Sequence, residues 1–327
     1  MIIHDPIYGK FKVEAPLAEL IGSAPLQRLK GIHQGGAGYL VNPKWNVTRY
    51  EHSVGVMLLI RRMGGCLKEQ IAGLLHDFSH TAFSHVMDLV MNHDEEDFHE
   101  VYFEKMLLNT EVADILRDHG IRPEDLLPLH RWNLLEQPAP ELCMDRIDYT
   151  LRDRFHYEQM EEEDIHRFLQ SIRVIGDRIC VETIEMAEWF VDAYYREVVD
   201  FFMDPLNVYA YDQLAWVIKL ALESGVLHID DLFTDDEAVL EKIRTSGDRQ
   251  LIRWLNQIHP GVQVEVGKPG REGDIHRHFK NRMINPLVYI GKDNFKRASE
   301  LSETVRVIHL QAEAKFRDGA HVRVISR

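Results

Sequence analysis

The chain has 327 residues, of which 45% are hydrophobic and 28% charged, proportions that are typical of a folded globular protein and exclude a disordered one. Acidic residues outnumber basic ones by 53 to 38, and the resulting net charge of −15 disfavours nucleic acids and anionic membranes as partners. No apolar run approaches the roughly 20 residues that span a membrane, and the three scattered cysteines suit a reducing compartment. We therefore expect a cytoplasmic protein that acts on a small molecule.

Apolar residues recur at helical spacing through the first two thirds of the chain. Thr48 is a good N-cap for a helix over residues 49–63, and a second apolar-periodic segment ends at His76. A short hairpin is expected around Gly176. Further helices are expected over residues 83–91, 100–108, 141–152, 183–203 and 206–224. Together these segments predict an all-helical domain over residues 1–235.

The pattern changes near residue 235. Two more helical segments are followed by four segments rich in β-branched residues, which we expect to be strands: residues 262–266, 286–290, 305–310 and 322–325. Residues 236–327 are therefore predicted to form a small α+β region. The fold class predicted for the whole chain is mainly α, with a helical core and this small C-terminal region.

Four residues in short motifs form a candidate metal-ligand set. His52 lies inside the helix expected over residues 49–63, His76 and Asp77 are adjacent at the end of the next helix, and Asp145 lies in a third. Imidazole nitrogen and carboxylate oxygen are the ligands of catalytic divalent metals that keep open positions for water and substrate. Burying so many polar groups without partners would be costly. The pattern therefore predicts a metal centre built by three helices.

Further histidines and an aspartate surround this set. His80 lies one turn after His76, His85 and Asp88 are three residues apart, and His99 directly precedes an acidic residue. Imidazoles near a metal-bound water can transfer protons or, when protonated, bind phosphate. A second interpretation stays open, in which His80 and His85 help to hold a second metal ion. We expect one ion.

Arginines beside the first and last metal ligands indicate an anionic substrate. Arg49 lies one turn before the first ligand, and Arg146 directly follows the last, with Tyr149 one turn beyond it on the same face. Because a guanidinium can bind two phosphate oxygens at once, these positions predict a metal-dependent phosphohydrolase. By contrast, Arg152 is expected to form only a surface salt bridge with Asp148, four residues earlier.

These motifs make the chain similar to the HD-domain phosphohydrolases, and within them to the deoxynucleoside triphosphate triphosphohydrolase branch that includes the SAM-and-HD-domain enzymes. The similarity is carried by segments in matching order: residues 5–6, 25–38, 49–55, 74–77, 83–85 and 145–149. The resemblance implies hydrolysis of a nucleoside triphosphate to nucleoside and triphosphate with the help of Mn²⁺, Mg²⁺, Fe²⁺ or Ni²⁺. It also implies assembly into homo-oligomers.

The resemblance assigns roles to individual residues. It implies metal ligands at His52, His76, Asp77 and Asp145, phosphate contacts from Arg49 and Arg146, and Tyr149 against the sugar. It implies water activation, phosphate placement and leaving-group protonation by His80, His85, Asp88 and His99. Gln34 matches a glutamine that reads the sugar 3′-hydroxyl, whereas Gly35 replaces a leucine that crowds out a 2′-hydroxyl. We therefore expect a weaker preference for deoxyribose.

Three interpretations of the function follow from these residues. The first is hydrolysis of (d)NTPs to nucleoside and triphosphate by a metal-activated water. The second is a nucleotidase or phosphatase that acts on a nucleoside monophosphate or another small phosphorylated metabolite. The third is a nucleotide-binding regulatory protein with little turnover. The intact ligand and histidine sets favour an enzyme, because a pure sensor would not need both.

Overall fold

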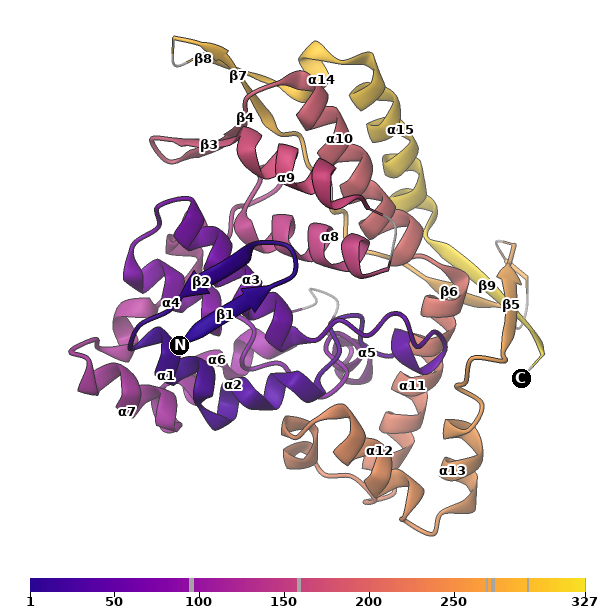
Figure 1. Cartoon of the computed structure of the whole chain (residues 1–327). Helices are drawn as coiled ribbons and strands as arrows, with labels where there is room; N and C mark the ends of the chain where they lie inside the picture. The colour runs from indigo at the N-terminus through magenta and orange to yellow at the C-terminus, as the bar shows by residue number, and fades with distance from the viewer. Residues whose placement is uncertain (94–96, 158–159, 269, 272–273, 293, 327) are drawn as a thin grey trace.

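The computed structural model describes the chain except residues 94–96, 158–159, 269, 272–273, 293 and 327. Helices predominate, so the predicted fold class, mainly α with a small α+β part, is confirmed (Figure 1). In the described part of the chain, no helix combines the length and the apolar character that crossing a membrane requires.

The α-helices are α1 (Leu17–Gly22), α2 (Ala24–Arg28), α3 (Arg49–Arg62), α4 (Leu67–Leu75), α5 (Val86–Met91), α6 (Phe98–Asn109), α7 (Glu111–Asp118), α8 (Met144–His156), α9 (Glu162–Ser171), α10 (Ile184–Tyr195), α11 (Pro205–Glu223), α12 (Asp236–Arg244), α13 (Arg249–Leu255), α14 (Ala298–Leu301) and α15 (Glu303–Asp318). The strands are β1 (Ile2–Asp5), β2 (Gly9–Lys12), β3 (Ile172–Ile175), β4 (Arg178–Val181), β5 (Gln263–Val266), β6 (Ile275–Arg277), β7 (Leu287–Gly291), β8 (Asn294–Arg297) and β9 (Ala320–Ser326).

Helix α3 lies at the centre of the N-terminal part. Thr48 and Glu51 cap it reciprocally: the Thr48 hydroxyl accepts from the Glu51 N–H, and the Glu51 carboxylate accepts from the Thr48 N–H. The helix expected over residues 49–63 is therefore confirmed. Helix α3 packs against α4 and α8, so polar residues at the C-terminal end of α4 and the N-terminal end of α8 come close to its own polar positions.

The two long helices expected after residue 183 are also present. Helix α10 continues into a π-helical turn (Arg196–Phe201), and α11 begins at Pro205, after an interval of three residues. The Asp204 carboxylate accepts from the Leu206 N–H at 2.8 Å, and Pro205 occupies the first helical position, where its missing N–H costs nothing. These caps explain why the chain breaks and restarts a helix at this point.

The described residues form three small sheets beside the helices. Their strand orders are β1-β2, β3-β4-β7-β8 and β5-β9-β6. The hairpin expected around Gly176 is confirmed as β3 and β4, and the expected strands at residues 262–266, 286–290 and 322–325 correspond to β5, β7 and β9. The parallel pairing of β4 with β7 joins the C-terminal segment to the middle of the chain.

The strand expected over residues 305–310 is wrong, because this segment belongs to α15. The Ser302 hydroxyl accepts from the Val305 N–H at 3.1 Å and caps the helix. Val305, Ala312 and Phe316 are buried, at spacings of seven and four residues that place them on one helical face. The β-branched residues of the segment favour a strand locally, and the packing of this face overrides that preference.

Residues after 235 pack in two different places (Figure 1). Val239 and Val322 belong to an apolar cluster with residues of α11, whereas Val288 and Phe316 belong to a second cluster with residues of α10 and the N-terminal helices. The chain between β6 and β7 runs from the first cluster to the second. The domain boundary predicted near residue 235 stays a prediction.

Candidate functional site

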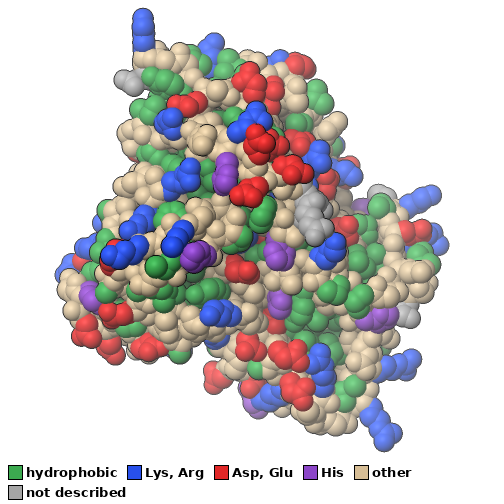
Figure 2. Space-filling view, viewed as in Figure 1, with side chains coloured by type: hydrophobic (Ala, Val, Ile, Leu, Met, Phe, Trp, Pro, Cys, Tyr) green, Lys and Arg blue, Asp and Glu red, His purple; other side chains and the backbone are tan. Residues whose placement is uncertain are grey.

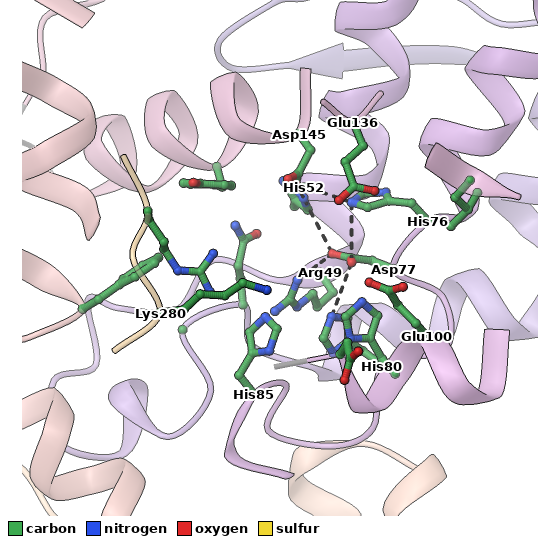
Figure 3. A pocket seen from close by; sticks show the side chains of 18 of the residues that line it. Arg49, His52, His76, Asp77, His80, His85, Glu100, Glu136, Asp145 and Lys280 are labelled. Atoms are coloured by element: carbon green, nitrogen blue, oxygen red, sulfur yellow. Dashed lines mark hydrogen bonds and ion pairs between the residues drawn. The ribbon is translucent and has the colours of Figure 1, made fainter. Parts of the chain in front are cut away.

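Three helices bring the four predicted metal ligands to one point (Figure 3). His52 lies within α3, His76 and Asp77 follow α4, and Asp145 lies in the first turn of α8. The His52 Nε2 atom is 3.1 Å from Asp145 Oδ1 and 3.6 Å from Asp77 Oδ2. The His76 Nε2 atom is 3.6 Å from the same Asp145 oxygen. Donor atoms this close fit a shared ion with ligand bonds of about 2.0–2.2 Å.

Hydrogen bonds orient both histidines for this role. The His76 Nδ1 atom is 2.8 Å from the Gly73 carbonyl, which can only accept, so Nδ1 carries the proton. The Nε2 atom of His76 is buried and has no hydrogen-bond partner among the described residues. The His52 ring is held through its Nδ1 atom, 2.8 Å from Asp148 Oδ2. Imidazoles held through Nδ1–H present the Nε2 lone pair to a metal, so the donor set fits a divalent ion.

The two carboxylates of the set are ionised at neutral pH. Burial alone would raise the pKa of Asp77, but the charges of Arg49 and the neighbouring histidines outweigh it and hold the pKa well below its usual range. The pKa of Asp145 is also lowered, because the hydrogen bond from His52 and the proximity of His76 outweigh its burial. Charged carboxylates are the form that binds metal.

A buried network supports His52 from behind. Arg152 donates two hydrogen bonds of 2.9 Å to Asp148, and its Nη2 atom also donates to Asp5 at 3.0 Å. The Tyr8 hydroxyl donates to Asp148 Oδ1 at 2.7 Å. The expected pairing of Arg152 with Asp148 is therefore confirmed, but its expected surface location is wrong, because both side chains are buried. Asp148 also orients the predicted metal ligand His52. The sequence contained one signal for this role, because Asp148 lies three residues after Asp145 and so shares its helical face.

Arg49 is held against the metal-ligand set. Its Nη1 atom donates to Asp77 Oδ2 at 2.6 Å and its Nε atom to the Ser84 hydroxyl at 2.9 Å. Ser84 and Phe83 have left-handed φ angles of 51° and 61°, which are unfavourable for such side chains. The Asp236 carboxylate stabilises this turn by accepting from the Phe83 N–H at 2.6 Å. Arg49 is therefore fixed before any ligand arrives.

Three histidine rings form a cluster beside the metal ligands. The His80 and His99 rings stack with centroids 3.8 Å apart, and the His85 ring lies edge-on to His80 at 5.0 Å. Burial lowers the pKa of His99 to about 3 and the pKa of His80 well below its usual value, so both rings are neutral at pH 7. Asp88 does not line the cavity; its carboxylate is 2.9 Å from His85 Nδ1 and orients that ring.

The predicted substrate-binding residues divide into two groups. Gln34, Arg49 and Tyr149 line the cavity, and in the part of the chain that the structure describes the buried Gln34 Oε1 atom has no hydrogen-bond partner. Arg146 does not line it. The Arg146 Nη1 atom donates to the carbonyls of Gln137 at 2.6 Å and Glu141 at 3.0 Å. The expected phosphate contact from Arg146 is therefore corrected: these carbonyls direct its guanidinium into the loop before α8.

The cavity has a volume of about 580 Å³ and contains residues that the motifs did not indicate. Glu100 and Glu136 face the metal-ligand set in Figure 3. Three cations come from the C-terminal segment: Arg277, Lys280 and Arg282. Glu100 directly follows a predicted histidine, which is a weak signal. No sequence signal indicated the three cations, because they lie far along the chain from every motif.

Comparison with known proteins agrees with this geometry. Residues 49–157, which include all four candidate metal ligands, match the HD domain. The uncharacterized protein YdhJ of Bacillus subtilis is 48% identical over 328 residues, which cover 100% of both chains. The metal-dependent phosphohydrolase cns2 of Cordyceps militaris is 38% identical over 239 residues, 69% of this chain and 67% of cns2. The chain belongs to the HD-domain phosphohydrolase superfamily.

Two more distant similarities concern fold and chemistry. The human deoxynucleoside triphosphate triphosphohydrolase SAMHD1 is 28% identical over 246 residues, 58% of this HD-domain phosphohydrolase and 39% of SAMHD1. The crystal structure of the phosphohydrolase BT4208 from Bacteroides thetaiotaomicron superposes with a TM-score of 0.76 over 100% of both chains at 19% identity. The latter similarity shows that the fold, including the C-terminal region, recurs as a whole.

The metal affinity of this HD-domain phosphohydrolase is expected to rise with pH. Burial disfavours a charged His52, but hydrogen bonds to Asp145 and Asp148 and the surrounding carboxylate charges outweigh it and raise its pKa to about 10. Below that pH, the proton on His52 must leave when a metal binds. Affinity should therefore increase by up to about tenfold per pH unit as the pH rises toward 10.

Calorimetric titration of the metal-free protein with Mn²⁺ at about pH 6.5, 7.5 and 8.5 measures this dependence. Repeating each titration in buffers with different ionisation heats counts the released protons. We expect close to one proton per bound ion from His52. An affinity that does not change with pH, with no proton released, would contradict the assignment of His52 as a ligand.

Proposed function

We propose that this HD-domain phosphohydrolase acts on nucleotides and hydrolyses (d)NTPs to nucleoside and triphosphate. The observation that supports this proposal is the composition of the cavity. Its volume of about 580 Å³ lies within the range of small-molecule sites. Part of its lining consists of the metal ligands, Arg49 and the histidines, and another part combines Gln34 with the aromatic side chains of Tyr149, Phe201, Phe202 and Tyr211. A nucleotide has the same two parts, a phosphate chain and a sugar with a planar base.

The residues around the phosphate would have separate roles in hydrolysis. A divalent ion at the ligand set would supply an activated water and polarise the phosphoryl oxygen. Arg49 is placed to bind phosphate oxygens and to stabilise the charge that develops on them during attack. In the reaction, the water oxygen bonds to the α-phosphorus, the bond to the sugar 5′-oxygen breaks, and that oxygen takes up a proton. The His80 and His99 pair is the candidate route for this proton.

The remaining predictions about partners stay proposals. Figure 2 shows Lys and Arg side chains interspersed with Asp and Glu over the visible face, which together with the net charge of −15 supports a small substrate over a nucleic acid. SAMHD1 is named as a dNTP triphosphohydrolase, and this supports the triphosphate substrate by similarity. A cytoplasmic location and homo-oligomeric assembly are proposed on the grounds given by the sequence.

Product analysis tests the proposed function. The purified protein with Mn²⁺ is incubated with dNTPs, NTPs, nucleoside monophosphates and phosphodiesters, and the products are separated by ion-exchange chromatography. The proposal predicts triphosphate and nucleoside in equal amounts. Orthophosphate released from monophosphates alone would instead assign a nucleotidase. Metal binding without turnover of any compound would favour the nucleotide-binding regulatory interpretation.

Substitution of Gly35 is expected to change the choice of sugar. A Cβ atom at this position would lie 3.4 Å from Phe201 Cζ and 3.9 Å from the Tyr157 hydroxyl, which are ordinary contacts, so a side chain fits without backbone strain. In Gly35→Leu, the added side chain should crowd the 2′-hydroxyl that only the ribonucleotides carry. Such a steric misfit costs about 1–3 kcal/mol, so kcat/KM for NTPs should fall about tenfold or more relative to dNTPs. Gly35→Ala is the control and should leave the ratio nearly unchanged. Equal losses for both sugars would contradict the prediction.

A further inference from the structure

The segment of residues 275–284, which we call the strap, passes along the cavity between two fixed ends. At its start, β6 pairs with β9, and the Arg277 carbonyl packs so closely on Gly319 that a Cβ there would lie only 2.6 Å from its oxygen. At its end, the Ile284 N–H donates to the Tyr195 hydroxyl at 3.2 Å. The strap is therefore positioned by contacts with β9 and α10, not by the HD-domain motifs.

The strap contributes three cationic side chains to the cavity. These are Arg277, Lys280 and Arg282. The Arg277 guanidinium lies 4.9 Å from the centre of the Tyr211 ring, and the Arg282 guanidinium lies 5.8 Å from that of Phe202. These cation–π contacts hold both guanidinium groups at the cavity wall.

Lys280 extends from the strap toward the part of the cavity where Arg49 and His85 lie (Figure 3). Two cations from opposite walls therefore face one space. Positive charges that converge in a cavity raise its potential and favour an anion between them. Arg49 is already hydrogen-bonded to Asp77 beside the metal ligands. Lys280 approaches from the other wall, where phosphates that do not contact the metal would lie.

We propose that the strap binds the phosphates beyond the one attacked, with Lys280 as the main contact, and that it selects polyphosphate esters over monophosphate esters. This inference rests on the proposed function and names the residues that would recognise the β- and γ-phosphates, which stay attached to the attacked α-phosphorus in the triphosphate product. A monophosphate needs only the metal and Arg49, whereas a triphosphate adds negative charge that extends away from them. Lys280, Arg277 and Arg282 supply positive charge along the strap for that extension.

Binding measurements separate this role from catalysis. The metal-loaded protein is titrated with inorganic tripolyphosphate and with orthophosphate, in Mg²⁺ that exceeds the polyphosphate so that the bound metal is not removed. In Lys280→Met, which removes the charge and keeps most of the side-chain volume, the Kd for tripolyphosphate should rise about tenfold, while the Kd for orthophosphate changes less than about twofold. Lys280→Arg should restore most of the tripolyphosphate affinity. Lys296→Met is the control, because this exposed lysine of β8 does not line the cavity.

The outcomes distinguish the strap from the proposed function. If the wild-type protein binds orthophosphate as tightly as tripolyphosphate and cleaves monophosphates, the proposed function fails, and the strap proposal fails with it. If the wild-type protein prefers tripolyphosphate but Lys280→Met leaves that preference intact, only the strap proposal is overturned. Equal weakening of both anions in Lys280→Met also overturns it, because Lys280 would then act on any phosphate.

Discussion

Replacing His76 with alanine is expected to remove the bound metal and the turnover together. The His76 Nε2 atom is buried and makes no hydrogen bond to any described residue, and the Gly73 carbonyl fixes the ring through Nδ1. Even groups that only support a metal ligand change affinity or activity about 10–100-fold, so loss of the ligand itself should exceed that range. Metal analysis after gel filtration and hydrolysis assays on the same samples measure both effects.

His76→Ala is a cleaner test than substitution of a carboxylate. Asp77→Ala should also abolish metal retention and turnover, but it leaves the buried Arg49 without its 2.6 Å partner. Such an unpaired buried charge destabilises a protein by about 3–5 kcal/mol, so the loss of function could then come from unfolding. His166→Ala, a change at an exposed residue of α9, is the control. Full metal retention in His76→Ala would contradict the assigned ligand set.

Replacing His99 with alanine should slow turnover and leave the metal in place. Its ring stacks on His80 and lines the cavity without joining the four candidate ligands. Burial lowers its pKa to about 3, so the ring is neutral at pH 7. It can then relay a proton by taking one up on one ring nitrogen as it releases one from the other. Loss of one positioned proton-transfer group lowers kcat by about 10²–10⁴-fold. Single-turnover assays with metal-saturated protein measure this step apart from product release.

Metal content decides between two roles for His99. Ligand atoms of Asp77, His80 and His99 lie within 4.8 Å of one another, so these residues could also hold an ion. If His99→Ala loses metal along with turnover, His99 is a ligand, and the prediction of a single ion is wrong. If the metal content is unchanged and kcat falls, His99 acts on the substrate or its leaving group.

The sequence was most informative where local signals and chemistry coincide. The reciprocal cap of Thr48 and Glu51 marks the start of α3, and the candidate ligand positions were predicted from residue type and helical spacing. Arg146 shows the limit of such reasoning. It directly follows Asp145 in the sequence, which suggested a place in the site. The direction of its long side chain depends instead on the carbonyls within its reach, here those of Gln137 and Glu141.

Contacts between distant segments explain the other features that the sequence analysis missed or predicted wrongly. The hairpin of β1 and β2 is too short to give a pattern, yet it carries Asp5 to the buried network of Arg152. The segment over residues 305–310 has β-branched residues but becomes helical because α15 buries one face. The strap enters the cavity only because its ends pack in different apolar clusters, and no local property of its residues indicates that placement.

The most direct test of the central claim is to follow hydrolysis as metal-free protein is titrated with Mn²⁺. The site geometry predicts no turnover without metal, and a rate that rises in proportion to bound ion and reaches its plateau at about one ion per chain. The released product should be triphosphate from a nucleoside triphosphate. Hydrolysis by the metal-free protein, or by His76→Ala at the wild-type rate, would contradict the claim that His52, His76, Asp77 and Asp145 hold the catalytic ion.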